Sequence, residues 1–492
     1  MINGDTAYQA LTSKDTRFDG LFYVGVTSTG IYCRPVCPVK APRRENCRFF
    51  ASAEAAEKAA FRPCLRCRPE LAPGNAPVDS AHRITDLLLQ RIDEGMIDEV
   101  SSLEEVAAWF HLSLRQLRRI VQQELGVSPL ELKQTRRLLL AKQLLTETRL
   151  PITEVAFASG FSSLRRFNDV FNARYRMPPS RLRKEAAAGE KELGHLGSST
   201  LLLSYRPPYN WQTMLDFLRL RALKNVEWVD DSRYTRTVQL GRYRGWICVT
   251  HVAEKNALQV EFSHTLTGAL PALLRRLRNL FDLNAHPQCI DERLRQDPLL
   301  TASIDRDPGL RVPGAFDGFE MTVRAVLGQQ ITVKAATTLG GRFVSAFGEA
   351  FETPFPELTR LAPQPQRITE ATIDEIASLG IVGARARCIL ALAAACASGE
   401  LQLDAGTHPE EMVQKLKQLP GIGDWTAAYI AMRALRWPDA FPAGDIVIRN
   451  NLGKISAKQA EARSKVWQPW RSYAVMHIWK NLAPKNRSAD YA

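Results

Sequence analysis

The stretch that decides the fold reads Leu419-Pro420-Gly421-Ile422-Gly423-Asp424-Trp425-Thr426-Ala427-Ala428-Tyr429. A Pro-Gly-x-Gly turn between two apolar helical segments predicts a helix-hairpin-helix. Glycines at 421 and 423 let the backbone turn tightly and bring free N–H groups close to a phosphate. Taken alone, such a turn is also compatible with a plain connector between helices. The residues around it favour a site.

A carboxylate and two aromatic side chains accompany this turn. Trp425 and Tyr429 follow on the second helix, and Asp445 comes 22 residues after Gly423, behind the break Pro442-Ala443-Gly444. Such an arrangement can hold a DNA backbone, stack a base and place an acid beside a sugar. We therefore expect Gly421 and Gly423 to contact DNA.

The composition is that of a globular protein with a polyanionic partner. At 492 residues, 45% of them hydrophobic, the chain predicts three or four domains. The formal net charge is +13, and between residues 110 and 184 there are 15 Lys and Arg against 5 Asp and Glu. The alternative is a merely basic protein, but this concentration in one segment favours nucleic acid.

The amino terminus has no basic region followed by an apolar run, and no stretch reaches transmembrane length. We therefore expect a cytoplasmic, nucleoid-associated protein without a membrane partner. The nine cysteines, an odd number, predict thiols and metal ligands rather than a disulfide framework.

Four cysteines within residues 1–76 have the spacing of a zinc site. They are Cys33-x3-Cys37 and, after 26 intervening residues, Cys64-x2-Cys67. Two close pairs separated by a loop can place four thiolates tetrahedrally around one zinc ion. A purely structural zinc is one interpretation. Nearby arginines favour a further role, because a thiolate amid cations stays ionised and can meet a phosphate.

Three stretches of this module resemble the amino-terminal domain of the Ada family: Thr29 to Cys37, Arg44-Glu45-Asn46 and Phe61 to Cys67. The resemblance implies that Cys33 accepts a methyl group from DNA methylphosphotriesters and that Cys37, Cys64 and Cys67 complete the zinc site. Methylating one thiolate removes negative charge that would repel DNA. Cys47 lies outside the spacing and is expected to be a buried thiol.

Residues 80–185 predict two helix-turn-helix units joined by a leucine-rich helix that starts at Ser128-Pro129. Caps at Ser102 and Ser113 open the helices of the first unit, and Gly160 and Ser163 mark the turn and second helix of the other. The segment resembles the AraC-type DNA-binding domain. The side chains expected to contact DNA are Arg115, Arg118, Arg165 and Asn168.

A linker is expected over residues 186–200, followed by an α+β subdomain on an antiparallel sheet over residues 201–290. Its strands are predicted at Thr237–Leu240, Trp246–Val249 and Leu258–Phe262. This subdomain shows no catalytic constellation of its own, so we expect it to act as a scaffold.

Helical patterns return over residues 300–485. The apolar helix 323–331 carries Gln329 and Gln330 to its end, where both are expected to contact DNA, and a second helix spans Trp467 to Trp479. We expect Trp467 and Trp470 to lie in the core and Trp479 to lie with Trp425 in a pocket.

From residue 201 to 484 the chain resembles AlkA-type 3-methyladenine DNA glycosylases of the helix-hairpin-helix superfamily. The resemblance implies that Asp445 is catalytic and that Trp425, Tyr429 and Trp479 line the base pocket with Phe217. The chemistry agrees, because an N-alkylated purine is cationic, binds aromatic faces and is a good leaving group. The base must leave the duplex, and a carboxylate can then stabilise an oxocarbenium-like transition state.

Departures from the superfamily patterns narrow the mechanism. Bifunctional members carry a lysine where this chain has Trp425, so we expect hydrolysis without strand cleavage. The chain has no cysteine after Cys396, so we expect no iron–sulfur cluster. Gln330 matches the residue that wedges into the vacated base stack, where the AlkA pattern is apolar. Lys480 stands where that pattern has an aromatic side chain.

The sequence thus predicts a multidomain chain: a four-cysteine zinc domain, an all-α double helix-turn-helix, an α+β subdomain and an all-α glycosylase domain. The predicted function joins excision of alkylated bases to an Ada-type activator that senses methylphosphotriesters. The expected partners are double-stranded DNA and RNA polymerase, and the chain is expected to be a monomer. Two alternatives stay open, namely a regulator whose glycosylase fold only binds DNA and a glycosylase with a purely structural zinc.

Overall fold

The computed structural model describes residues 4–14, 19, 22–50, 52–69, 84–85, 88–89, 102–108, 110, 112–186, 195–404 and 409–481. The chain divides into two compact units, and the division falls inside helix α7 (Pro129–Glu147), between Gln134 and Thr135. Most of the expected linker, residues 187–194, lies outside the described residues. So do residues 70–83, where the first predicted domain meets the second.

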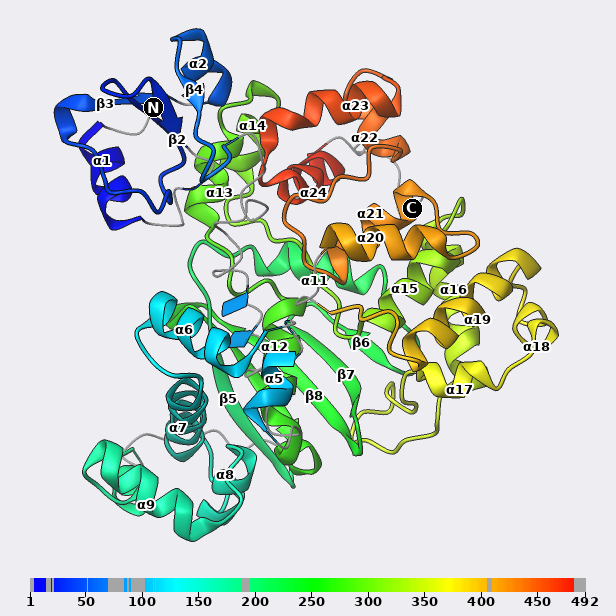
Figure 1. The fold of residues 1–492 in the computed structure, drawn as a ribbon. Helices are drawn as coiled ribbons and strands as arrows, with labels where there is room; N and C mark the ends of the chain where they lie inside the picture. Colours follow the sequence, from blue (N-terminus) through cyan, green and yellow to red (C-terminus); the bar gives the residue numbers. More distant parts are fainter. Residues whose placement is uncertain are drawn as a thin grey trace. The chain divides into compact units, whose positions relative to one another are not determined.

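The first unit contains a small sheet with strand order β3-β1-β2-β4 (Figure 1). Its elements are α1 (Gly4–Ser13), β1 (Tyr23–Val26), β2 (Ile31–Cys33), β3 (Cys47–Phe50), α2 (Ala53–Lys58) and β4 (Arg62–Pro63). Strands β2 and β4 are parallel, with Tyr32 opposite Pro63. Because Cys33 ends β2 and Cys64 follows β4, this pairing brings the two cysteine pairs together.

The first predicted helix-turn-helix is formed by α5 (Leu103–Ala108) and α6 (Leu114–Leu125). Ser113 caps α6, because its Oγ accepts from the backbone N–H of Gln116 and the Gln116 side chain accepts from the backbone N–H of Ser113. Leu117 on the inner face of α6 is fully buried. The cap therefore fixes where the basic helix begins and which of its faces is exposed.

The second helix-turn-helix belongs to the second unit and uses α8 (Ile152–Ala158) and α9 (Leu164–Tyr175), followed by α10 (Pro179–Ala186). Gly160 turns the chain between α8 and α9 with a φ of +81°, a conformation that L-residues with side chains rarely adopt. Ser163 caps α9 by accepting from the backbone N–H of Arg166.

The predicted antiparallel sheet follows, and it has five strands in the order β5-β9-β8-β7-β6 (Figure 1). Its elements are β5 (Ser198–Ser204), α11 (Trp211–Arg219), β6 (Glu227–Val229), β7 (Arg233–Leu240), β8 (Tyr243–Val252), β9 (Ala257–Ser263) and the helix packed on the sheet, α12 (Leu270–Leu280). Strand β5 begins inside the range expected to be a linker.

The edge of this sheet is covered by the carboxyl half of α7. The side-chain amide of Gln143 donates to the carbonyl of Leu202 at 2.8 Å, and the backbone N–H of Leu202 donates to Glu147 at 2.8 Å. Edge strands expose unpaired backbone groups, so these bonds satisfy part of β5. Buried residues of α7, α8 and α9 also share one apolar cluster with those of the sheet.

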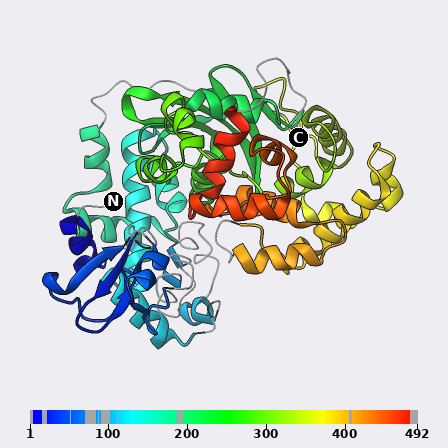
Figure 2. The same ribbon diagram turned by 90° about the horizontal axis from the view of Figure 1, so that it is seen from above.

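The remainder of the second unit is helical. Its helices are α13 (Pro287–Leu294), α14 (Pro298–Arg306), α15 (Gly318–Leu327), α16 (Val333–Phe347), α17 (Pro365–Thr369), α18 (Ile373–Ala377), α19 (Gly383–Ala397), α20 (Pro409–Gln418), α21 (Asp424–Arg433), α22 (Ile446–Asn451), α23 (Ala457–Ser464) and α24 (Arg471–Asn481). The orange and red helices of the carboxyl-terminal part lie side by side in both views (Figures 1 and 2).

Two helix boundaries differ from the sequence-based expectation. Helix α15 ends at Leu327, so Gln329 and Gln330 lie in the turn beyond it. The helix expected from Trp467 begins only at Arg471, because Pro469 lacks an N–H and disfavours helical backbone at the residue before it. Trp467 is fully buried, in agreement with its predicted place in the core.

Candidate active site and metal centre

Asp445 lies at the amino-terminal end of α22 and is held by three hydrogen bonds. Its Oδ1 accepts from the backbone N–H of Ile448 at 3.0 Å, which caps the helix. The indole N–H of Trp425 donates to Oδ2 at 3.1 Å, and that of Trp479 donates to Oδ1 at 3.3 Å. With 4% of its surface exposed, the carboxylate has a fixed orientation.

The four aromatic side chains expected in a base pocket line one cavity together with Asp445. The cavity has a volume of about 1560 Å³, and its lining includes Phe217, Trp425, Tyr429 and Trp479. Trp425 and Tyr429 are one turn apart on α21, and their rings are stacked with centroids 5.3 Å apart and planes 5° apart. Three separate helices, α11, α21 and α24, therefore supply the aromatic walls.

The hairpin before α21 leads into a helix whose amino-terminal end has no side-chain cap. Gly421 has a φ of +87°, which explains the glycine there. Gly423 is the residue before α21 and offers no side-chain cap, and a methyl group at its position would meet no atom within 4 Å. The first N–H groups of a helix lack intrahelical partners, so this end of α21 can receive a phosphate.

The two glutamines after α15 have different environments. The side-chain amide of Gln329 donates to the carbonyl of Gly421 at 2.8 Å and to the hydroxyl of Thr426 at 3.0 Å. Gln330 is exposed and has a φ of +56°, an uncommon conformation for a residue with a side chain. Gln329 thus ties the turn to the hairpin, and Gln330 is the residue that projects from it.

Sequence reasoning missed three arginines that surround Tyr429. Arg433 donates from Nη1 to the Tyr429 hydroxyl at 2.9 Å, and Arg221 and Arg324 line the same cavity. Burial alone would raise the pKa of Tyr429, but the charges of the three arginines outweigh it and lower this pKa below its usual value. Arg433 lies on α21, Arg221 in the turn after α11 and Arg324 on α15. Only the position of Arg433, one helical turn after Tyr429, was visible in the sequence.

Lys480, the residue after Trp479, is held at the rim of the cavity. Its ammonium group donates to Asp307 at 2.6 Å. The pairing, together with the charge of Arg306, keeps the pKa of the Asp307 carboxyl below its usual value despite burial, which would raise it. The position that the AlkA pattern fills with an aromatic side chain is therefore an ion pair.

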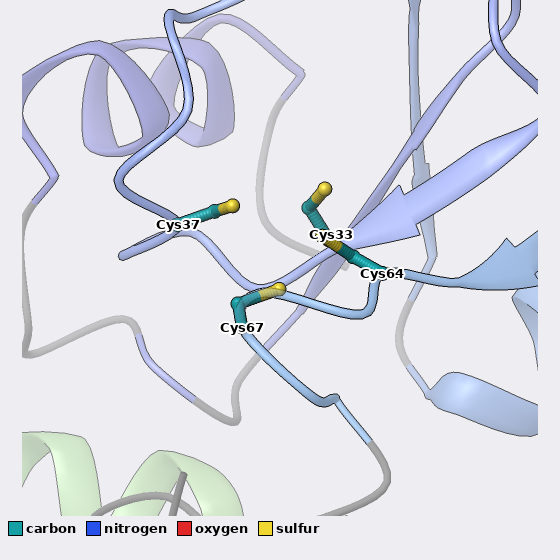
Figure 3. A group of neighbouring side chains, drawn as sticks. All are labelled: Cys33, Cys37, Cys64 and Cys67. Atoms are coloured by element: carbon teal, nitrogen blue, oxygen red, sulfur yellow. The ribbon is translucent and has the colours of Figure 1, made fainter. Parts of the chain in front are cut away.

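The four predicted cysteines form one cluster, shown in Figure 3. Their sulfur atoms all lie within 4.8 Å of one another, and tetrahedral Zn²⁺ with Zn–S bonds of about 2.3 Å separates its ligands by about 3.8 Å. The residues therefore fit a zinc ion with four thiolate ligands. Cys37, Cys64 and Cys67 are buried, and Cys33 is partly exposed.

Cys47 is buried outside this cluster, as predicted, and its thiol donates to the carbonyl of Arg43. Burial raises the pKa of the Cys47 thiol. Arg34, next to Cys33, turns its guanidinium to Asp19, with Nε donating at 2.8 Å, and its backbone N–H donates to the sulfur of Cys67 at 3.3 Å. Arg34 therefore stabilises the loop that carries Cys33 and Cys37.

The side chains expected to contact DNA from the two helix-turn-helix units lie on the faces opposite the buried ones. Arg115 and Arg118 are exposed on α6, and Arg165 is exposed on α9. Asn168, also on α9, is half-buried. Among the described residues, no helix has both the length and the apolarity needed to cross a bilayer.

Comparison with known families matches four segments of the chain. Family models match as the "Metal binding domain of Ada" at residues 6–70, a "Helix-turn-helix domain" at 106–185, the "AlkA N-terminal domain" at 200–317 and the "HhH-GPD superfamily base excision DNA repair protein" at 323–472. These matches confirm the resemblances found in the sequence and the predicted multidomain fold.

One relative matches almost the full length of the chain, and others match part of it. A probable bifunctional transcriptional activator/DNA repair enzyme AlkA of Mycobacterium tuberculosis is 39% identical over 97% of this chain and 96% of the relative. DNA-3-methyladenine glycosylase 2 of Escherichia coli is 36% identical over 56% of this chain and 95% of its own length. A 3-methyladenine DNA-glycosylase from Archaeoglobus fulgidus shares the fold, with a TM-score of 0.50 at 21% identity over 56% of this chain and 96% of that one. The chain belongs to the family of bifunctional transcriptional activator/DNA repair enzymes of the AlkA type.

Proposed function

We propose that this chain removes alkylated bases such as 3-methyladenine from double-stranded DNA by hydrolysis and that Asp445 is its catalytic carboxylate. The observation that carries the proposal is the position of Asp445. Its carboxylate lies in the cavity that the aromatic side chains enclose, and two of those aromatics orient it. A carboxylate that only capped α22 would not need to line a cavity.

In the proposed reaction, the target nucleotide leaves the duplex and its base enters between the rings of Trp425, Tyr429 and Trp479. A cationic alkylated purine is attracted to these electron-rich faces. As the bond from C1′ to the base nitrogen breaks, Asp445 stabilises the positive charge on the sugar and orients the attacking water. The electron pair stays with the base, which leaves as a neutral molecule.

The DNA backbone would be held by the open end of α21 at Gly421 and Gly423. Gln330 would fill the space that the flipped base vacates, because it projects from the turn after α15. The role of Gln329 would be to fix that turn against the hairpin rather than to contact DNA itself. The turn that carries Gln330 and the hairpin that binds the DNA backbone would then keep a fixed position relative to each other.

Trp425 occupies the position at which a lyase would carry its Schiff-base lysine, so the reaction stops at the abasic site. Incubation with methylated DNA tests both statements. Free 3-methyladenine should appear, and strands should break only after alkali. No released base from the wild-type protein would contradict the enzyme, and a covalent adduct with DNA after borohydride reduction would contradict hydrolysis. An absence of iron from the purified protein would agree with the expectation that no iron–sulfur cluster is present.

A second activity is proposed for the cysteine cluster. Cys33 would accept a methyl group from a DNA methylphosphotriester, since it is the partly exposed member of the four. Bound zinc would keep the cysteines ionised as thiolates. The Cys33 sulfur attacks the methyl carbon, the carbon–oxygen bond breaks and the phosphate leaves as a diester anion. A mass gain of one methyl group on the peptide that contains Cys33 is the expected result, and an unmodified Cys33 would favour a structural zinc.

The two helix-turn-helix units would address promoter DNA through Arg115, Arg118, Arg165 and Asn168. As an activator the protein would act on RNA polymerase, and as a monomer it would carry both reading helices on one chain. Footprinting of upstream regions before and after Cys33 methylation tests the regulatory part. Sedimentation of the free protein tests the monomer.

A further inference from the structure

The hydroxyl of Tyr429 is surrounded by groups that can only donate hydrogen bonds. Arg433 donates to it at 2.9 Å, and the positive charge of Arg221 also acts on it. Arginine has no acceptor atom, so the tyrosine oxygen is the acceptor in the bond from Arg433. Its own proton then has no acceptor among these neighbours and is free to point into the cavity that Tyr429 lines.

Two of the arginines near Tyr429 carry charges that no carboxylate offsets. Arg324 is paired with Glu227 at 2.9 Å and with Glu320 at 3.3 Å. Arg433, by contrast, is 3% exposed and bonds to the carbonyls of Pro313 and Gly314 and to Tyr429. Within the described part of the chain, neither Arg433 nor Arg221 forms an ion pair.

The same two guanidinium groups enclose another wall of the cavity. Both guanidinium groups lie against the ring of Phe217. The guanidinium carbon of Arg221 is 3.8 Å from the ring centroid and that of Arg433 is 4.7 Å from it. A buried charge without an ion-pair partner lowers the stability of the fold, so we expect these charges to serve the reaction. The aromatic faces attract a cationic base, whereas the positive charges of the arginines stabilise negative charge on a departing one.

We propose that Tyr429 is a catalytic proton donor to the departing base and that Arg433 and Arg221 hold the phenolate that results. The step deepens the proposed glycosylase function and rests on it. Its use would be the excision of neutral lesion bases. A neutral base that leaves with the electron pair of its bond to C1′ becomes an anion, whereas an alkylated cationic base leaves neutral and needs no proton.

The proton balance follows from this difference. The bond from C1′ to the base nitrogen breaks, and the base takes the Tyr429 proton. Water adds to C1′ and gives up a proton to solvent, either directly or through Asp445, which then releases it. Solvent then reprotonates the phenolate, so the enzyme returns to its starting state. The lowered pKa of Tyr429 is consistent with this role, because it makes the hydroxyl a stronger acid.

The test compares two substrates in one variant. Tyr429→Phe keeps the ring that stacks on Trp425 and removes only the hydroxyl. Full-length wild type and variant are given duplex DNA containing hypoxanthine, a neutral lesion, and duplex DNA containing 3-methyladenine. General acids contribute about 100-fold or more to rate, so hypoxanthine release should fall by that factor. Release of 3-methyladenine should fall much less, so the ratio of the two rates is the quantity that reports the lost proton donor.

Tyr473→Phe is the matched control, because Tyr473 is another buried tyrosine whose hydroxyl donates to a carboxylate, Asp282, outside the cavity. Any effect of this variant on folding should lower both releases equally. Equal losses for both bases in Tyr429→Phe would overturn the proposal, since they would make Tyr429 a stacking residue only. Release of 3-methyladenine but not of hypoxanthine by the wild type would overturn it as well. Release of neither base would instead contradict the glycosylase function on which the step rests.

Discussion

The indole nitrogen of Trp425 lies 3.1 Å from Oδ2 of Asp445, although 20 residues separate the two in the chain. The stack with Tyr429 places the same indole in the wall of the base cavity. One side chain therefore stacks on the base and also orients the carboxylate. A substitution at Trp425 that keeps the stacking ring but removes the hydrogen bond to Asp445 tests how much each role contributes to catalysis.

Trp425→Phe makes this separation, because it keeps an aromatic face and removes the N–H. A hydrogen bond to a charged group is worth about 1.5–3 kcal/mol, so we expect release of 3-methyladenine to slow about tenfold or more. Binding of methylated DNA should weaken less than the rate falls. Single-turnover kinetics measure both quantities.

Trp470→Phe is the control for that change. The indole nitrogen of Trp470 is buried, packs outside the cavity and has no hydrogen-bond partner among the described residues. Its loss should leave the release rate unchanged. An unaltered rate in Trp425→Phe would show that the indole bond to Asp445 contributes nothing to catalysis.

Gly423→Ala tests phosphate binding at the hairpin. The backbone of Gly423 has φ −92° and ψ −178°, which alanine adopts without strain, and the added methyl group meets no protein atom. The fold should therefore stay intact, while the methyl group keeps a phosphate from the end of α21. Affinity should fall equally for damaged and undamaged DNA, because a phosphate contact carries no sequence information.

Gly383→Ala is a suitable comparison, since Gly383 also stands at the start of a helix, α19, and an added methyl group there would meet only Nη1 of Arg387, in ordinary contact at 4.0 Å. Fluorescence anisotropy with labelled duplexes measures the affinities. Equal affinity for the two variants would mean that the hairpin does not contact the backbone.

The local parts of this protein were predictable from its sequence, and the tertiary parts were not. Cysteine spacing and the hairpin glycines depend on a few neighbouring residues, so the four-cysteine cluster and the carboxylate beside the hairpin could be inferred. Arg221 and Arg324 reach Tyr429 from distant segments, and no local pattern indicates that. The bond from Gln329 to Gly421 spans 92 residues and was likewise invisible. The start of β5 at Ser198 was missed because its partner, β9, lies some sixty residues later.

Cys33→Ser and Cys47→Ser should have different effects on metal content. Cys33 belongs to the cluster whose sulfur atoms lie within 4.8 Å of one another, whereas Cys47 bonds only to a backbone carbonyl. We expect the wild type and Cys47→Ser to bind one zinc ion each. Cys33→Ser should bind it more weakly and should not gain a methyl group from methylphosphotriester DNA.

Competition with a chromogenic chelator measures the zinc affinities. A chelator strong enough to remove the ion should also abolish methyl transfer while base excision, which uses Asp445, continues. Loss of zinc from Cys47→Ser would place the metal elsewhere than in the four-cysteine cluster.

Stability should depend on pH through His477. Burial lowers the pKa of His477 from 6.5 to about 4, and the hydroxyl of Ser303 lies 2.7 Å from its Nδ1. The unfolded chain therefore takes up the proton first as the pH falls. The contribution of neutral His477 to the free energy of unfolding is therefore fully present above pH 6.5 and is lost as the pH falls toward 4. By pH 5 the loss is about 2 kcal/mol.

Denaturant unfolding of the wild type and of His477→Gln, followed at pH 7.5 and at pH 5, measures this contribution. The variant is expected to be less stable at pH 7.5 and to lose less stability than the wild type on acidification. If wild type and variant lost the same free energy of unfolding between pH 7.5 and pH 5, His477 would be protonated at pH 5 as readily in the folded protein as in the unfolded chain.

Asp445→Asn tests the central claim most directly. Asparagine keeps the oxygen that caps α22, so the variant should fold and should still bind methylated DNA. The measurement is release of 3-methyladenine from methylated duplex DNA by equal amounts of wild type and variant. Rapid release by the wild type and a loss of at least about 100-fold in the variant are the predicted result, since one removed charge-stabilising group costs that much. Equal release by the two proteins would contradict the account.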